Sequence, residues 1–127
     1  MAAQMAALSI AFDAPDNSTG PCPSKIRPID LVHLAKQTMG DKRLEIEVLQ
    51  MFARQARASL QDIASGETIR VGAAAHRLKG AASSVGAFCV SQAAEAVEEN
   101  GGDAGARAAL GAAVIDAENF ILKLCRG

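Results

Sequence analysis

The sequence predicts an all-α fold, an up-down-up-down four-helix bundle with a short additional helix at its N-terminal side. Hydrophobic residues make up 50% of the 127 residues, but Trp and Tyr are absent and alanine is abundant, which favours closely packed helices. Apolar residues recur at spacings of three and four in several segments, and no strand-like alternation or hairpin signal is present. Short breaks separate the long segments, so successive helices are expected to be antiparallel neighbours.

Residues 1–27 are predicted to be a flexible tail, because they are rich in turn-forming residues and lack helical periodicity. The folded domain is expected over residues 28–127. A short first helix is predicted from Ile29 to about Met39. It ends at Gly40, since glycine readily adopts the backbone conformation that follows a helix.

The second helix is expected to start after Asp41, which can cap it, and to run to about Ala64. Its buried stripe follows helical spacing and comprises Val48, Leu49, Phe52, Ala56, Leu60 and Ile63. The pair Ser65-Gly66 breaks the chain. The third helix is then expected from about Glu67 to Val85.

Gly86 separates the third helix from a fourth, which is expected over about 87–99. Residues 100–102 read Asn-Gly-Gly and form a loop, after which Asp103 can cap the last helix, over about 104–124. The last helix repeats apolar residues as a bundle helix does, at Leu110, Val114, Ala117, Ile121 and Leu124.

Charge and composition exclude several classes of function. The formal net charge is −1 and no basic block occurs, which argues against nucleic-acid binding. No apolar run approaches the roughly 18 to 20 residues that span a membrane. Cys22, Cys89 and Cys125 are odd in number and form no CxxC pair, so no disulfide framework or zinc site is expected and reduced thiols fit better. We therefore expect a soluble, cytoplasmic protein without a bound metal.

The most informative residue is His76 in the predicted third helix. On a helical projection, apolar residues lie on the side opposite His76: Val71, Ala74, Leu78, Ala81, Ala82 and Val85. The residues around His76 are small or polar: Gly72, Ala73, Lys79, Gly80 and Ser83. The imidazole is therefore predicted to face solvent. An interior glycine costs about 1 kcal/mol relative to alanine, so Gly72 and Gly80 indicate a surface that another protein approaches closely.

The run His76-Arg77-Leu78-Lys79-Gly80, followed by Gly86-Ala87, resembles the His-x-Leu-Lys-Gly motif of histidine-containing phosphotransfer (HPt) domains. Further matches to the family pattern are Ile29-Asp30-Leu31, Phe52 and Gly66-Glu67. The resemblance extends over roughly residues 28–124 by the periodicity of the helices.

This resemblance implies that His76 accepts a phosphoryl group from an aspartyl phosphate on a receiver domain. It then passes the group to another response regulator in a multistep two-component phosphorelay, as in bacteria. Lys79 would hold phosphate oxygens, and Gly80 would leave room for the group and the partner's loops. Glu98 falls where a polar side chain of the next helix often hydrogen-bonds the His ring, although Gln is also common there. Gln92 and Glu95 are nearby alternatives.

The expected partners are receiver domains of response regulators and of a hybrid sensor histidine kinase. Their docking face would include Gly72, Ala73, Arg77, Ser83 and Ile69, which lie on the His76 side of the helix. Ile69 fits equally well as a packing residue at the start of the helix. No acidic cluster converges on His76, so the partner receiver is expected to supply Mg²⁺. The protein is expected to be a monomeric carrier rather than an enzyme, because nothing in the chain supplies an ATP-binding domain.

Three alternatives deserve comparison with this hypothesis. A docking module of the same fold would bind receivers or kinases without carrying phosphate, but His76 and Lys79 are both present. A self-phosphorylating histidine kinase fragment would need a glycine-rich nucleotide site, which is missing. A metal-binding bundle is disfavoured because neither His33 nor His76 lies in a Glu-x-x-His arrangement. His33 is expected to be a packing or surface residue.

Overall fold

The computed structural model describes residues 27–126. Within this range all regular structure is helical and no strand occurs, which confirms the predicted all-α class. The five helices are α1 (Leu31–Thr38), α2 (Lys42–Ala64), α3 (Thr68–Val85), α4 (Phe88–Glu99) and α5 (Ala104–Arg126). The predicted tail lies outside the described residues, apart from Arg27.

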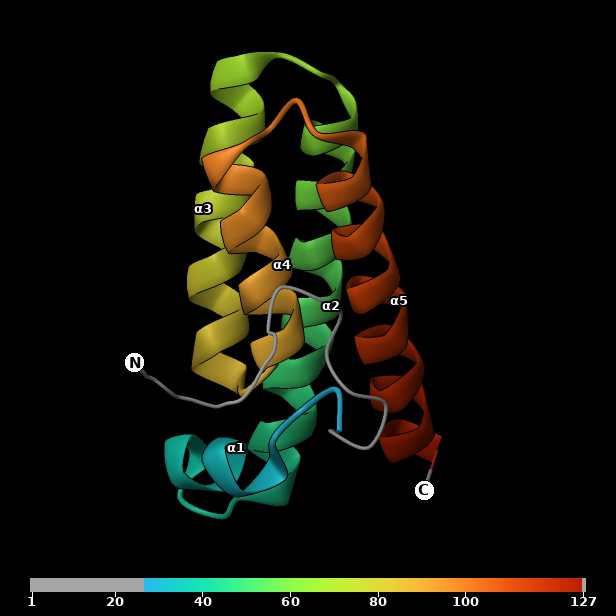
Figure 1. The fold of residues 1–127 in the computed structure, drawn as a ribbon. Coiled ribbons are helices and arrows are strands. Elements are labelled where there is room, and N and C mark those ends of the chain that lie inside the picture. The colour runs from blue at the N-terminus through green and yellow to red at the C-terminus, as the bar shows by residue number, and fades with distance from the viewer. Residues whose placement is uncertain (1–26, 127) are drawn as a thin grey trace, which may run out of the picture.

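The four longer helices run side by side, and the short α1 lies at one end of them (Figure 1). Helix α2 packs against α3 and α5, and α4 packs against the same two helices, so the four form a closed ring of neighbours. Helix α1 contacts α2 and α3. None of the helices from Leu31 to Arg126 is both long enough and apolar enough to cross a membrane.

Helix α1 is shorter than the sequence predicts at both ends. The Asp30 side chain accepts hydrogen bonds from the backbone N–H groups of Val32 and His33, at 3.0 and 3.1 Å, so Asp30 is the N-cap. Ile29, predicted as helical, precedes this cap and is fully buried. Met39 ends the helix with a φ of 56°, in the left-handed region.

The longer helices differ from the predicted ranges by two residues at most. Asp41 caps α2 by accepting a hydrogen bond from the Leu44 N–H at 3.1 Å. Glu67 and Ala87 occupy the N-cap positions of α3 and α4 and are not themselves helical. Helix α5 continues to Arg126. These differences arise at helix ends, where sequence patterns are least informative.

The core lies between α2, α3, α4 and α5 and consists mainly of Leu, Val, Ile and Ala side chains. In the predicted α2 stripe, Leu49, Phe52, Ala56 and Ile63 are buried, whereas Val48 and Leu60 are half-buried against the core.

Three polar residues are buried that the apolar pattern did not indicate, namely Thr38, Glu45 and Ser59. The Thr38 hydroxyl donates to the Leu34 carbonyl at 3.0 Å and lies 3.4 Å from Glu45 Oε2. Glu45 also pairs with Lys42 at 3.6 Å, so the polar groups at the α1–α2 junction satisfy one another.

Two cysteines lie in the described part of the chain. Cys125 is free, whereas Cys89 is disulfide-bonded, contrary to the expectation that the thiols are all reduced. Cys22 lies outside the described residues. His33 packs its ring edge-on against Phe88, with the ring centroids 5.2 Å apart.

Candidate functional site

Helix α3 presents His76 on its outer face. The opposite face of α3 is buried in the core through Val71, Ala74, Ala75, Leu78, Ala82 and Val85. The His76 side chain, by contrast, is 69% exposed. The apolar residues of α3 recur at helical spacing and share one face. Because that face is buried in the core, His76 on the opposite face is exposed to solvent.

Glu98 of α4 holds the His76 ring. The ring Nδ1 lies 2.8 Å from Glu98 Oε2. Lys79 and His76, in that order of effect, lower the pKa of Glu98, so this carboxyl is an ionised acceptor near neutral pH. The Nδ1 atom is then the donor in the neutral ring, and the lone pair resides on Nε2.

Lys79 binds the same carboxylate through its other oxygen. The distance from Lys79 Nζ to Glu98 Oε1 is 3.1 Å. The hydrogen bond with Glu98 and its charge raise the pKa of Lys79, and the charges of Glu95 and Glu99 add to the effect. A single carboxylate from α4 therefore joins the imidazole and an ammonium group that lies one helical turn away on α3.

The surface around His76 is open. A Cβ atom added at Gly72 or at Gly80, one turn before and one turn after His76, would meet no atom within 4 Å apart from adjacent residues and the backbone of its own helix. Ala73 is exposed as well. Ile69, two turns before His76, is an apolar side chain that is 88% exposed. Another protein's backbone therefore has room to approach the imidazole closely.

Two of the predicted docking residues also bind neighbouring helices. Arg77 Nη2 donates to Asp62 Oδ2 of α2 at 3.2 Å. The Ser83 and Ser91 hydroxyls lie 2.8 Å apart, and the Ser91 hydroxyl is 3.3 Å from the Lys79 carbonyl. These contacts fix α3 between α2 and α4 near the site. Sequence reasoning did not single out Asp62 or Ser91, because neither shows any local motif.

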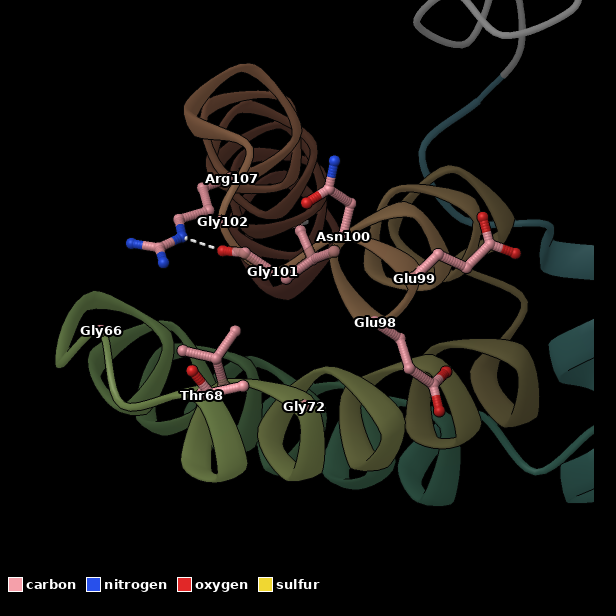
Figure 2. A pocket seen from close by; sticks show the side chains of 11 residues that line it. Gly66, Thr68, Gly72, Glu98, Glu99, Asn100, Gly101, Gly102 and Arg107 are labelled. Atoms are coloured by element: carbon pink, nitrogen blue, oxygen red, sulfur yellow. Dashed lines mark hydrogen bonds between the residues drawn. The ribbon is translucent and has the colours of Figure 1, made fainter.

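A cleft of ≈ 390 Å³ borders the site where the ends of α3, α4 and α5 meet (Figure 2). Gly72 and Glu98 line both the cleft and the surroundings of His76. Arg107 Nε donates to the Gly101 carbonyl at 2.7 Å, and the rest of its guanidinium points outward (Figure 2). Two glycine-containing breaks in the sequence, at Gly66 and at residues 100–102, meet at this end and line the cleft. The sequence analysis identified the breaks but not the cleft.

The site contains no residue set suited to a metal ion. Across residues 27–126, no group of three or more His, Cys, Asp or Glu side chains is arranged to hold one. The positive charge near His76 comes from Lys79, while Arg77 is bound to Asp62.

The helices that carry His76 and Glu98 lie in a segment that matches a known protein family. The model of the Hpt domain family matches residues 47–120, more than half of the chain. The matched segment contains His76, Lys79, Gly80 and Glu98. No curated protein and no solved structure matches the chain.

Proposed function

Because this chain belongs to the Hpt domain family, a family of phosphotransfer modules in phosphorelays, we propose that His76 is its phosphoryl-carrying residue. In this proposal His76 accepts a phosphoryl group from an aspartyl phosphate of one receiver domain and passes it to the aspartate of another. The observation that carries the proposal is the exposed His76 ring held through Nδ1 by Glu98, with Lys79 bound to the same carboxylate.

The hydrogen bond to Nδ1 supports Nε2 as the nucleophile in this proposal. Glu98 engages Nδ1, so Nε2 is the nitrogen with a lone pair available for attack on phosphorus. A neutral imidazole is a competent nucleophile near pH 7, because its unperturbed pKa is about 6.5. The resulting nitrogen–phosphorus bond is labile, which suits a group that must move on.

Lys79 provides positive charge for the proposed reaction. The transition state of phosphoryl transfer is loose and highly charged, so positioned cations stabilise it. Lys79 lies one helical turn from His76 and can reach phosphoryl oxygens, while Gly80 leaves the group and the partner's loops room. The Mg²⁺ and the acidic residues of the reaction belong to the partner receiver in this proposal.

The proposal extends to partners and setting. The receivers belong to response regulators and to a hybrid sensor histidine kinase, and they dock on the face formed by Ile69, Gly72, Ala73, Arg77 and Ser83. The protein acts as a monomeric cytoplasmic carrier without kinase activity of its own. The ring of contacts among α2, α3, α4 and α5 and their short connections support an up-down-up-down order for the bundle.

Phosphoryl transfer from a panel of phosphorylated receiver domains tests the proposal. Wild-type protein is expected to acquire an acid-labile, base-stable label, and His76→Gln is expected to acquire none while it keeps its helical circular dichroism, because the side chain is exposed. His33→Gln is the matched control, since it removes the imidazole that packs on Phe88 and should keep the label.

Two results would contradict the proposal. Label on His76→Gln would place the phosphoryl group elsewhere. Wild-type protein that binds receivers but takes no label from any of them would instead support the docking module without phosphate.

A further inference from the structure

The His76 site contains one carboxylate for two groups that carry positive charge during the reaction. Glu98 Oε2 lies 2.8 Å from His76 Nδ1, and Glu98 Oε1 lies 3.1 Å from Lys79 Nζ. The Glu98 side chain is 30% exposed, less than half the exposure of the imidazole. A residue needed only to orient the ring could be a neutral amide, which accepts the same hydrogen bond. The ionised carboxylate therefore calls for a separate explanation.

The bonds that form and break in the proposed transfer explain why a carboxylate is present. The Nε2 lone pair of His76 forms the bond to phosphorus, and the bond from phosphorus to the donor's aspartyl oxygen breaks, with its electron pair leaving on that carboxylate. Because Nδ1 already bears a hydrogen, the phosphorylated ring carries a positive charge at the moment of its formation. In the reverse step the electron pair of the nitrogen–phosphorus bond returns to Nε2, and the ring becomes neutral again. No proton has to move in either direction, provided that Nδ1 keeps its hydrogen.

We propose that Glu98 is a positioning residue that keeps the proton on Nδ1 of phosphorylated His76, so that the phosphoryl group always leaves from a protonated ring. This inference rests on the proposed function of His76. A phosphorylated imidazole without that proton would have to depart as an imidazolate anion, a much poorer leaving group. A carboxylate at 2.8 Å favours the charged ring, as an opposite charge at such a distance does.

The other charged groups of the site are consistent with separate roles for Lys79 and Glu98. In the phosphorylated protein, Lys79 turns to the phosphoryl oxygens, and Glu98 is left to the charged ring, so each positive group faces a negative one. Glu95 and Glu99 of α4 act on Lys79 through their charge, and neither is hydrogen-bonded to His76. On the α2 side, Arg77 and Asp62 neutralise each other at 3.2 Å. Glu98 is therefore the charged group that is hydrogen-bonded to the ring.

The test compares the pH dependence of phosphoryl transfer in wild-type protein and in Glu98→Gln. Both proteins are loaded with phosphoramidate, a small phosphoryl donor, and mixed with one acceptor receiver between about pH 6 and about pH 9. The glutamine carbonyl can still accept the Nδ1 hydrogen bond, so ring orientation is retained while the charge is lost. Glu95→Gln and Glu99→Gln are matched controls, because each removes one charge of α4 without touching the ring.

The wild-type protein and both controls are expected to transfer at similar rates across this range, after correction for the receiver's own pH dependence. The Glu98→Gln rate should fall about tenfold or more toward the alkaline end, since an unassisted imidazole has lost most of its proton there. Its phosphorylated form should also be longer-lived at alkaline pH. Nitrogen NMR of the phosphorylated ring should find the Nδ1 hydrogen retained to higher pH in the wild type than in the variant.

Parallel pH profiles, or a wild-type phosphorylated ring without its Nδ1 hydrogen at neutral pH, would overturn the role of Glu98 while His76 remains the carrier. Wild-type His76 that takes label neither from phosphoramidate nor from any phosphorylated receiver would overturn both the proposed function and this inference. The loading step thus separates the two failures.

Discussion

At the scale of single residues, the site combines an imidazole that is hydrogen-bonded to a carboxylate with a surface that leaves the ring accessible. Glu98 fixes the His76 tautomer at 2.8 Å, and the two glycines of α3 that flank His76 leave open space around the ring. These glycines weaken the helix by about 1 kcal/mol each relative to alanine. We interpret that loss of stability as the consequence of keeping the approach to His76 clear.

Gly80→Leu tests this interpretation. The added side chain would project into empty space, because a Cβ at this position meets no atom within 4 Å. Leucine also favours a helix more than glycine does, so the free energy of unfolding should rise by up to about 1 kcal/mol. Transfer from a receiver should nevertheless fall by about tenfold or more, as leucine occupies the space of the partner's loops. Normal transfer rates with every receiver would show that docking does not use this surface.

The residues of the site differ in how far the sequence alone could predict them. His76, Lys79 and Gly80 share one helix, so their relation follows from spacing alone. Glu98 came from the family resemblance and not from periodicity, since it lies on another helix. The bonds of Arg77 to Asp62 and of Ser83 to Ser91 depend on the rotation of α2 and α4 against α3. That rotation results from the packing of the whole bundle. The sequence positions of Asp62 and Ser91 therefore do not predict that they reach α3.

At the scale of elements, the C-terminal end of α3 depends on Gly86. This glycine has a φ of 86°, and a Cβ there would lie 2.8 Å from the Asp30 carbonyl oxygen. The Asp30 N–H also donates to the Gly86 carbonyl at 2.9 Å. The residue that caps α1 thus packs directly on the turn between α3 and α4.

Gly86→Ala should therefore destabilise the protein by about 2 kcal/mol or more, from the left-handed backbone and the clash with Asp30 together. Chemical denaturation followed by circular dichroism measures this. Gly111→Ala is the matched control, because Gly111 lies inside α5 with open space at its Cβ position, and alanine there should stabilise by about 0.5 to 1 kcal/mol. Equal stability of the two variants would contradict the close packing of Asp30 on Gly86.

The helices themselves were largely predictable, because long amphipathic periodicity and glycine breaks are local signals. The sequence located Asp41 as a cap, but it placed Ile29 inside the first helix, since an apolar residue beside a helix resembles one within it. Burial of Thr38 and Glu45 was not predictable either. Their polar groups satisfy each other only after α1 has folded back on α2.

At the scale of the whole molecule, the buried core contacts and the proposed phosphoryl site lie on opposite faces of the same helix. Leu78 is fully buried two residues after His76, and the core beneath it joins α3 to the rest of the bundle. Small domains are stable by only about 5 to 15 kcal/mol. A change on the inner face of α3 can therefore consume much of that margin, whereas a change on the outer face leaves it intact.

Leu78→Ala and His76→Gln should separate these two properties. The first variant leaves a cavity in the core and should lose about 2 to 5 kcal/mol of unfolding free energy, with a clearly lower Tm. At a temperature well below that Tm, its folded molecules should still accept the phosphoryl group at close to the wild-type rate, because the outer face is unchanged. His76→Gln should lose the label while its stability stays within about 0.5 kcal/mol of the wild type. Thermal denaturation and label transfer on the same two preparations measure both. A Leu78→Ala protein that is fully folded but unable to accept the group would show that the packing beneath His76 also sets the geometry of the site.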